Sequence, residues 1–392
     1  MKKICVVTGS RAEYGLLKPL LHELNTMPEF AVRIIATGSH CSPEFGLTYK
    51  EVESDGFTID RKIEILVSSD TCVATCKAMG LAHISFAEAY AQLKPDLVIV
   101  LGDRFEIFSA VASACVSRIP VAHLHGGEIT EGAVDDSLRH CITKMSHLHF
   151  TSTAEYRRRV IQLGENPRFV FGVGAIGLDN VRNLKLLSRT ELERQLGFKF
   201  CGKNLLVTFH PATLEDDTAS GQMKALLAAI DSTPEVFTIF TKANADAGGR
   251  IINKLIDSYA SRNPSRCSAH ASLGQLRYLS LMKQVDAVVG NSSSGIIEAP
   301  SFRIGTINIG DRQKGRIKAR SVIDCEPTSA SIVRALRKMY SKDFQERLRS
   351  TKNPYEKNAT ARSIARVIKS TLLRDGLVLK KKFFDLPVGE KW

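Results

Sequence analysis

The chain has 392 residues, of which 44% are hydrophobic and 24% charged, proportions typical of a folded globular protein with more than one domain. The net charge of +13 favours anionic partners. Nucleic acid is disfavoured as the partner, because the only tight basic run is Lys380-Lys381-Lys382 and no nucleic-acid-binding motif accompanies it.

The N-terminus leads directly into a strand that we expect over residues 4–7. No signal-peptide pattern precedes it, and no apolar run approaches the roughly 18 residues of a membrane span, so we expect a cytoplasmic protein without a membrane partner. The turn Thr8-Gly9-Ser10-Arg11 and an amphipathic helix follow. Such a helix start binds phosphate readily. Arg11 is therefore a candidate anion ligand, with a solvated surface cation as the alternative.

A second strand is expected over residues 31–37, and residues 71–93 read as one long helix or two. Lys94-Pro95-Asp96 ends this helical segment. The run that follows, residues 97–101, contains no polar residue. This pattern is typical of a strand buried on both faces of a parallel sheet.

The segment 101–140 is dense in titratable side chains. Asp103 and Arg104 follow the buried strand, and a strand expected over 120–124 leads to His125. The carboxyl ends of such strands form the ligand-binding edge of an open α/β sheet. Paired carboxylates also begin a helix expected over 137–144, where simple helix capping is the alternative role. The titratable residues are Asp103, Arg104, Glu106, His123, His125, Glu128, Glu131, Asp135, Asp136, Arg139 and His140.

Residues 147–151, 154–163 and 169–171 continue the alternation of strand and helix, which predicts a parallel sheet. The segment 172–177 then matches G-x-G-x-x-G. A dinucleotide site would need a clear helix at the third glycine and an acidic residue after a second strand. Only a short helix is expected here, so we interpret these glycines as a connection between two domains.

In the second half, strands expected over 204–208, 236–240 and 286–289 end in polar segments. Gly290-Asn291-Ser292-Ser293-Ser294-Gly295 offers N–H groups and hydroxyls to a diphosphate, with a plain serine cap as the alternative. Glu298, expected one turn into the next helix, can accept hydrogen bonds from a ribose. A strand over 305–309 is followed by three cations.

The nine cysteines are scattered, odd in number and never arranged as C-x-x-C. This distribution favours reduced thiols over a disulfide framework or a zinc site. We expect no cofactor and no metal.

Six motifs together resemble the hydrolysing UDP-N-acetylglucosamine 2-epimerases of sialic-acid and related nonulosonic-acid biosynthesis. They are TGSRAEYG (8–15), LGDRFE (101–106), HGGEITEGAVDDSLRH (125–140), FHP (209–211), GNSSSGIIE (290–298) and GDRQKGR (310–316). The resemblance covers nearly the whole chain and implies an α/β, GT-B fold with two Rossmann-like domains, parallel sheets and an active-site cleft between them. The implied domains are 1–175 with the catalytic carboxylates, 176–360 for UDP, and a helix and tail, 361–392, that cross back to the first domain.

The same resemblance implies the site residues. Asp103 and Asp135 fall at catalytic positions, and either His125 or Glu128 would take the place of a Glu that many relatives carry at His125. The residues implied to bind UDP are Arg11, Arg104, His210, Asn244, Ser292, Ser293, Glu298 and Arg312.

The implied reaction converts UDP-GlcNAc and water to N-acetylmannosamine and UDP, by elimination of UDP to a glycal and rehydration. The related substrate UDP-2,4-diacetamido-2,4,6-trideoxyglucose, used for legionaminic-type sugars, is the second candidate, and segments 42–46 and 129–132 look closer to that branch. A non-hydrolysing 2-epimerase and a GT-B glycosyltransferase are the alternatives. We expect a homo-oligomer, in which Leu81, Ile84 and Phe86 serve an interface or, alternatively, the core.

Overall fold

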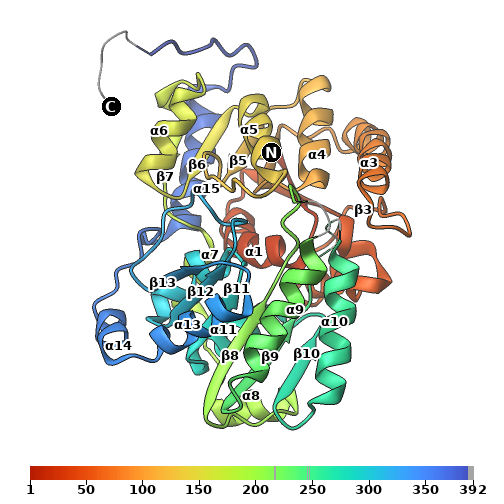
Figure 1. Ribbon diagram of the computed structural model, residues 1–392. Coiled ribbons are helices and arrows are strands. Elements are labelled where there is room, and N and C mark those ends of the chain that lie inside the picture. Colours follow the sequence, from red (N-terminus) through yellow and green to blue (C-terminus); the bar gives the residue numbers. More distant parts are fainter. Residues whose placement is uncertain (216–217, 245, 247, 387–392) are drawn as a thin grey trace. The chain divides into compact units, whose positions relative to one another are not determined.

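The computed structural model describes residues 1–215, 218–244, 246 and 248–386. Two parallel β-sheets form the framework, and each belongs to its own compact unit (Figure 1). Unit 1 contains residues 1–128, 135–180 and the chain from Tyr355 onward, and unit 2 contains residues 129–134 and 181–354. These divisions lie after Asn180 and Pro354, whereas the sequence analysis expected them after residues 175 and 360.

The sheet of unit 1 has seven strands in the order β3-β2-β1-β4-β5-β6-β7. All of its neighbouring strands pair in parallel. Its strands are β1 (Lys2–Thr8), β2 (Phe30–Thr37), β3 (Arg61–Ile63), β4 (Leu97–Leu101), β5 (Val121–Leu124), β6 (Leu148–Thr151) and β7 (Val170–Gly172). Its main helices are α1 (Arg11–Asn25), α2 (Tyr49–Ser54), α3 (Cys72–Leu93), α4 (Phe105–Val116), α5 (Asp135–Met145), α6 (Ala154–Gln162) and α15 (Thr360–Ser370).

The central position of β4 in the sheet explains why its sequence is apolar throughout. Leu97, Ile99 and Leu101 belong to one core cluster, with α1 and α15, while Val98 and Val100 belong to another, with α3 and α4. Successive side chains of a strand point to opposite faces, so both faces of β4 are buried. Each such side chain stabilises the fold by roughly 1.5–3 kcal/mol.

Helix α15 shows how the C-terminal part of the chain joins unit 1. Ala361, Ile364, Ala365 and Ile368 follow helical spacing and lie in the core cluster that contains the leucines of α1. Asp179 caps this helix, because its carboxylate accepts hydrogen bonds from the backbone N–H groups of residues 360 and 361 at 3.2 and 2.7 Å. The cap thus comes from a residue distant in sequence.

The sheet of unit 2 has six parallel strands in the order β10-β9-β8-β11-β12-β13. They are β8 (Lys203–Thr208), β9 (Val236–Thr241), β10 (Cys267–His270), β11 (Ala287–Gly290), β12 (Gly305–Ile309) and β13 (Val322–Cys325). The helices of the unit are α8 (Arg189–Leu196), α9 (Thr218–Asp231), α10 (Gly249–Arg262), α11 (Gly274–Gln284), α12 (Ser294–Ile297), α13 (Ser329–Met339) and α14 (Lys342–Arg349).

Three expectations can be compared with these elements. Residues 72–93 form one helix, and α7 (Gly177–Asn183) is the short helix at the third glycine of G-x-G-x-x-G. Leu81 and Ile84 are 44% and 64% exposed on α3, whereas Phe86 is buried in the core. None of the described helices has the length and the apolar character needed to cross a membrane.

Candidate functional site

The carboxyl ends of β4 and β5 hold the loops with the expected catalytic residues of unit 1. The backbone N–H of Gly102 donates to Leu124 O at 3.0 Å, and that of His125 donates to Phe150 O at 2.9 Å. Gly102 has φ +82°, a conformation that glycine adopts without strain. The chain therefore turns sharply after β4, and Asp103 follows at once.

Arg139 of α5 ties this loop to the next one. Its guanidinium is buried, pairs with the Asp103 carboxylate, and donates to Asp136 Oδ1 at 3.0 Å and to Glu128 O at 2.9 Å. One buried cation thus holds together three segments that were expected near one another because two follow neighbouring strands and the third begins the next helix. The signal for its role was its spacing from Asp136, because residues three apart on a helix lie on the same face.

His125 and Glu128, which the sequence analysis treated as alternatives, lie together as a pair. His125 Nδ1 is 2.8 Å from Glu128 Oε1, which also accepts a hydrogen bond from Ser152 Oγ at 2.8 Å. The other ring nitrogen of His125, Nε2, is buried and has no hydrogen-bond partner in the described part of the chain. A carboxylate that fixes Nδ1–H leaves Nε2 available to accept or donate a proton.

His125 has φ +67°, a left-handed conformation that is unfavourable for any residue with a side chain. Such strain is typical of functional positions. Gly127 follows with φ +78°, and a Cβ atom there would lie 2.5 Å from Tyr156 O. Close packing on α6 therefore requires glycine at this position and limits where His125 can lie.

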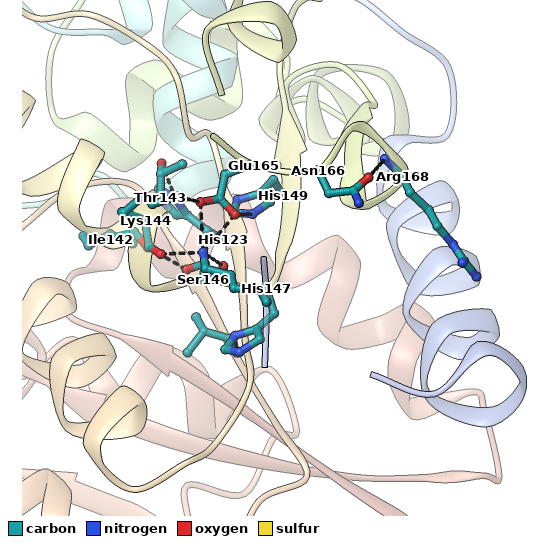
Figure 2. A network of polar contacts seen from close by, with 12 residues as sticks. His123, Ile142, Thr143, Lys144, Ser146, His147, His149, Glu165, Asn166 and Arg168 are labelled. Carbon is teal, nitrogen blue, oxygen red and sulfur yellow. Dashed lines mark hydrogen bonds and ion pairs between the residues drawn. The ribbon is translucent and has the colours of Figure 1, made fainter. Parts of the chain in front are cut away.

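His123 of β5 makes positioning contacts that sequence reasoning missed, and Figure 2 shows it together with Thr143. Burial lowers its pKa to about 3, so the ring is neutral. Nε2 then donates to Gly102 O at 2.8 Å, while Nδ1 accepts from Thr143 Oγ1 at 3.1 Å. His123 therefore holds the carbonyl that precedes Asp103, and it is not available as a base at neutral pH.

Two expected anion ligands of unit 1 lie at helix starts. Arg11 is the first residue of α1, whose cap is Ser10, and Arg104 is the residue before α4. Arg104 Nε donates to Glu106 Oε1 at 2.7 Å. Asp135, the remaining expected catalytic residue, is the first residue of α5.

In unit 2, Asn291 connects three of the sequence motifs. Its side chain accepts from His210 N at 2.7 Å and donates to His210 O at 2.8 Å. Its backbone carbonyl accepts from Arg312 Nη1 at 3.1 Å and from Gln313 Nε2 at 2.9 Å. Asn291 is part of the GNSSSGIIE motif, but this role could not be predicted from the sequence, because the contacts join segments far apart in the chain.

The serine segment after β11 departs from one expectation. Helix α12 is a single turn, Ser294–Ile297, so Glu298 is the residue that follows it and does not lie one turn inside a longer helix. A 3-10 helix, Ala299–Phe302, comes next because Pro300 has no N–H to continue an α-helical pattern. Ser292 Oγ lies 3.0 Å from Ser294 Oγ and accepts from Ser294 N at 3.4 Å.

Gly290 must be glycine, since a Cβ atom would lie 1.9 Å from Thr208 O and φ is +131°. This close approach of β11 to β8 brings the serine segment beside His210. His210 Nδ1 is 3.6 Å from Asp246 Oδ2. Asn244 lies between β9 and α10, next to Ala243, whose N–H and C=O are both bound by the Asn253 side chain.

Residues 129–134, which follow Glu128 in sequence, belong to unit 2. Glu131 N donates to Lys314 O at 3.2 Å, and Val134 N donates to Thr213 Oγ1 at 3.0 Å.

Unit 1 contains six of the twelve expected site residues, and unit 2 contains the other six. Across the described residues, no three His, Cys, Asp or Glu side chains are grouped so that they could hold a metal ion.

Comparison with known proteins decides the family. The family model described as UDP-N-acetylglucosamine 2-epimerase matches residues 22–369. The chain belongs to this epimerase family. This confirms the family that the six motifs indicated.

Relatives of this epimerase cover most of the chain. It is 44% identical to GDP/UDP-N,N'-diacetylbacillosamine 2-epimerase (hydrolysing) of Campylobacter jejuni, over 88% of this chain and 89% of that protein. It is 35% identical to UDP-N,N'-diacetylbacillosamine 2-epimerase (hydrolysing) of Legionella pneumophila, over 87% and 90%. The crystal structure of UDP-GlcNAc 2-epimerase from Neisseria meningitidis bound to UDP-GlcNAc matches with a TM-score of 0.79 at 16% identity, over 94% and 100%. The expected fold of two Rossmann-like, parallel-sheet domains of the GT-B class is confirmed.

Proposed function

We propose that this epimerase converts a UDP-linked 2-acetamido sugar and water to the free 2-epimeric manno sugar and UDP. UDP-N,N'-diacetylbacillosamine, which is UDP-2,4-diacetamido-2,4,6-trideoxyglucose, is the favoured substrate, and UDP-GlcNAc is the second. The observation that carries the choice is the similarity to the two hydrolysing 2-epimerases that are named for this sugar. The product would be a precursor of a nonulosonic acid.

The reaction requires proton removal from a carbon that is not acidic. As the bond from C1 to the UDP oxygen breaks, positive charge develops at C1, and the proton at C2 becomes removable. The first product is a glycal with a double bond between C1 and C2. Water then adds its OH to C1, and a proton returns to C2 from the opposite face. Each general acid or base step contributes about 10² to 10⁴ in rate.

We assign the proton transfers to residues of unit 1. The imidazole of His125, with Nδ1 fixed by Glu128 and Nε2 free of hydrogen bonds within the described residues, has the arrangement of a general acid or base. The carboxylates of Asp103 and Asp135 are the other candidates for proton transfer. Arg139 holds Asp103 in place, so that its oxygens have a defined direction.

We assign UDP binding to the cations and hydroxyls at helix starts and strand ends. Charge-assisted hydrogen bonds of this kind contribute roughly 1.5–3 kcal/mol each. Stabilising the leaving diphosphate also stabilises the transition state, since negative charge grows there as the C1–O bond breaks. Glu298 would bind the ribose, and the remaining ligands would be Arg11, Arg104, His210, Asn244, Ser292, Ser293 and Arg312.

Two other activities are less well supported. A non-hydrolysing 2-epimerase would keep UDP on the sugar, but the relatives at 44% and 35% identity are named as hydrolysing enzymes. A glycosyltransferase would not need a dense set of proton-transfer groups, because sugar transfer leaves the C2 proton in place.

We also expect a homo-oligomer, which light scattering of the purified chain would test.

Proton NMR in D₂O, with each UDP-sugar in a separate tube, tests the proposal. We expect free UDP together with a manno sugar that carries deuterium at C2, and faster turnover of the diacetamido substrate. A UDP-manno sugar without UDP release would show the non-hydrolysing reaction. Unchanged substrates in both tubes would overturn the proposed function.

Replacement of Asp103 by Asn should abolish turnover, with a loss of at least about 10² in kcat, because the amide cannot exchange the proton. UDP should still bind, as measured by calorimetry, since the proposed UDP ligands remain. The exposed Asp343 on α14 provides the control, because Asp343→Asn removes a carboxylate far from both sets of expected residues in the sequence. Loss of UDP binding in Asp103→Asn would assign Asp103 a structural role.

A further inference from the structure

Two buried glutamates flank Gly9, at the end of β1. The N–H of Gly9 donates to Glu13 Oε2 at 2.7 Å. On the other side, a Cβ atom at Gly9 would lie 2.5 Å from Glu106 Cγ and 2.7 Å from Glu106 Oε1. Glu13 and Glu106 are 6% and 0% exposed. The absence of a side chain at Gly9 therefore makes room for Glu106, while the Gly9 N–H binds Glu13, so both carboxyl groups contact one residue.

The hydrogen bonds of these two carboxyl groups are incomplete. Glu106 Oε1 accepts from Arg104 Nε at 2.7 Å, but Glu106 Oε2 and Glu13 Oε1 are buried and accept no hydrogen bond within the described part of the chain. Two carboxylates would face one guanidinium here. A buried charge without a partner is strongly unfavourable, whereas one proton on the pair would remove the excess charge and provide a donor.

The surrounding charges favour that proton. Burial and the nearby charge of Glu106 raise the pKa of Glu13 to about 8, with a smaller contribution from Asp103, while Arg104 and the Gly9 N–H oppose them. His40, which bonds Thr8 Oγ1 at 3.0 Å, adds no positive charge at neutral pH, because burial lowers its pKa to about 4.

We propose that Glu13 carries a proton beside the Glu106 carboxylate, so that the pair positions Arg104 and the segment Gly9–Arg11 for the anionic substrate. Glu13 is then a positioning residue for the reaction. This inference rests on the proposed function, in which Arg11 and Arg104 bind the diphosphate.

The arrangement has a consequence for substrate binding at alkaline pH. When Glu13 ionises, a second negative charge competes for Arg104 and reduces the positive potential at the start of α1. The diphosphate of a UDP-sugar does not titrate in this range. If only the protonated form of Glu13 binds substrate, KM should rise about tenfold from pH 7 to pH 9, while kcat changes less.

The pH profile of KM tests the pair, with UDP-N,N'-diacetylbacillosamine or whichever of the two UDP-sugars is turned over. In Glu13→Gln the amide oxygen can still accept from Gly9 N–H and the side chain carries no charge at any pH, like the protonated acid, so KM at pH 7 should stay within about threefold and the alkaline rise should vanish. Glu106→Gln should move the rise to lower pH, because one cause of the raised pKa is gone. Glu23→Gln, on the same helix, should leave the profile unchanged.

An unchanged alkaline rise in Glu13→Gln would overturn the proposal, since another group would then be titrating. In the alternative, an ionised Glu13 merely caps α1. Glu13→Gln would then be less stable than the parent protein, and KM would depend on pH in the same way in both proteins.

A measurement without substrate separates this inference from the proposed function. The melting temperature of Glu13→Gln relative to the parent protein should increase from pH 5 to pH 8, because the parent alone must keep a proton that its unfolded state releases. If this trend appears without turnover of any UDP-sugar, the proton pair stands and the proposed function fails. If turnover is found but the trend is absent, the pair is wrong.

Discussion

Glu13 and Glu165 are both buried glutamates of unit 1, but their neighbours carry opposite charges. Burial alone raises the pKa of both carboxyl groups. Beside Glu13 stands the carboxylate of Glu106, and the pKa of Glu13 rises to about 8. Around Glu165, hydrogen bonds and charges of His149, Lys144 and Lys381 outweigh burial and lower the pKa to about 2. The same residue type is thus a proton carrier in one place and a permanent anion in the other.

The network around Glu165 joins α5 and β6 to the end of the described chain (Figure 2). Lys381 Nζ donates to both carboxylate oxygens of Glu165, at 2.9 and 2.8 Å, and to Ser146 O at 2.7 Å. Lys144 and His149 lie 2.7 and 3.1 Å from the same carboxylate. Three nitrogen groups therefore surround one carboxylate.

Lys381 belongs to residues 377–386, the C-terminal tail. The tail also binds unit 1 through its backbone, because Phe384 N donates to Gly164 O at 2.9 Å, and Phe384 and Leu386 pack on Val160, Ile161 and Val170. The Glu165 network is therefore an attachment for the tail, whereas the Glu13 pair lies at the expected anion-binding loop. Which function a buried glutamate has follows from its partners.

Glu165→Gln should have the largest effect on stability. It leaves Lys381 and Lys144 without their counter-charge, and breaking a buried ion pair in this way lowers the free energy of unfolding by about 3 kcal/mol at neutral pH. Urea denaturation followed by circular dichroism measures the change. Glu155→Gln is the control, since Glu155 is 48% exposed and its pairing with Arg159 is worth less than about 1 kcal/mol.

The pH dependence of Glu165→Gln should run opposite to that of Glu13→Gln. The folded pKa of Glu165 is depressed, so its contribution is complete above pH 4.5 and is lost as the pH falls toward 2. The deficit of Glu165→Gln should therefore shrink below pH 4.5, while the advantage of Glu13→Gln grows between pH 4.5 and 8. Parallel trends in the two variants would show that burial, and not the neighbouring charges, controls these groups.

Lys381→Met should have a smaller effect, about 1 to 2 kcal/mol, because Lys144 and His149 remain beside Glu165 and the Lys381 side chain is 30% exposed. The tail should be released, which limited proteolysis followed by mass spectrometry would detect as faster cleavage near residue 380. Lys380→Met is the matched control, since this neighbour is exposed and its loss leaves the network intact. Equal cleavage in both variants would show that the ion pair does not hold the tail.

Local patterns of the sequence were predicted correctly, whereas contacts between distant residues were not. Strand β4 was predicted with its observed bounds, because an apolar run between turn signals is a local pattern. The motifs were correctly placed after strands for the same reason. The partner of Glu165 was not predicted, since Lys381 lies 216 residues away and was interpreted only as part of a basic run. The roles of Glu13 and Asn291 were missed because they depend on contacts between distant segments. The length of α12 was missed although Pro300 gives a local signal that an α-helical pattern ends.

Gly164→Ala tests the tail without changing a charge, and its difference in stability from the control Gly197→Ala is the smallest of the expected effects. Gly164 has φ +86°, and a Cβ atom would lie 2.3 Å from the Phe383 ring; Gly197 has φ +61° with nothing within 4 Å. Both alanine variants should lose roughly 1–2 kcal/mol from the left-handed conformation. Gly164→Ala should also displace the ring that Lys144 faces at 4.6 Å, a further loss of about 0.5 kcal/mol. Faster tail cleavage in Gly164→Ala than in Gly197→Ala is therefore expected, and equal cleavage would mean that Phe383 contributes nothing to the attachment.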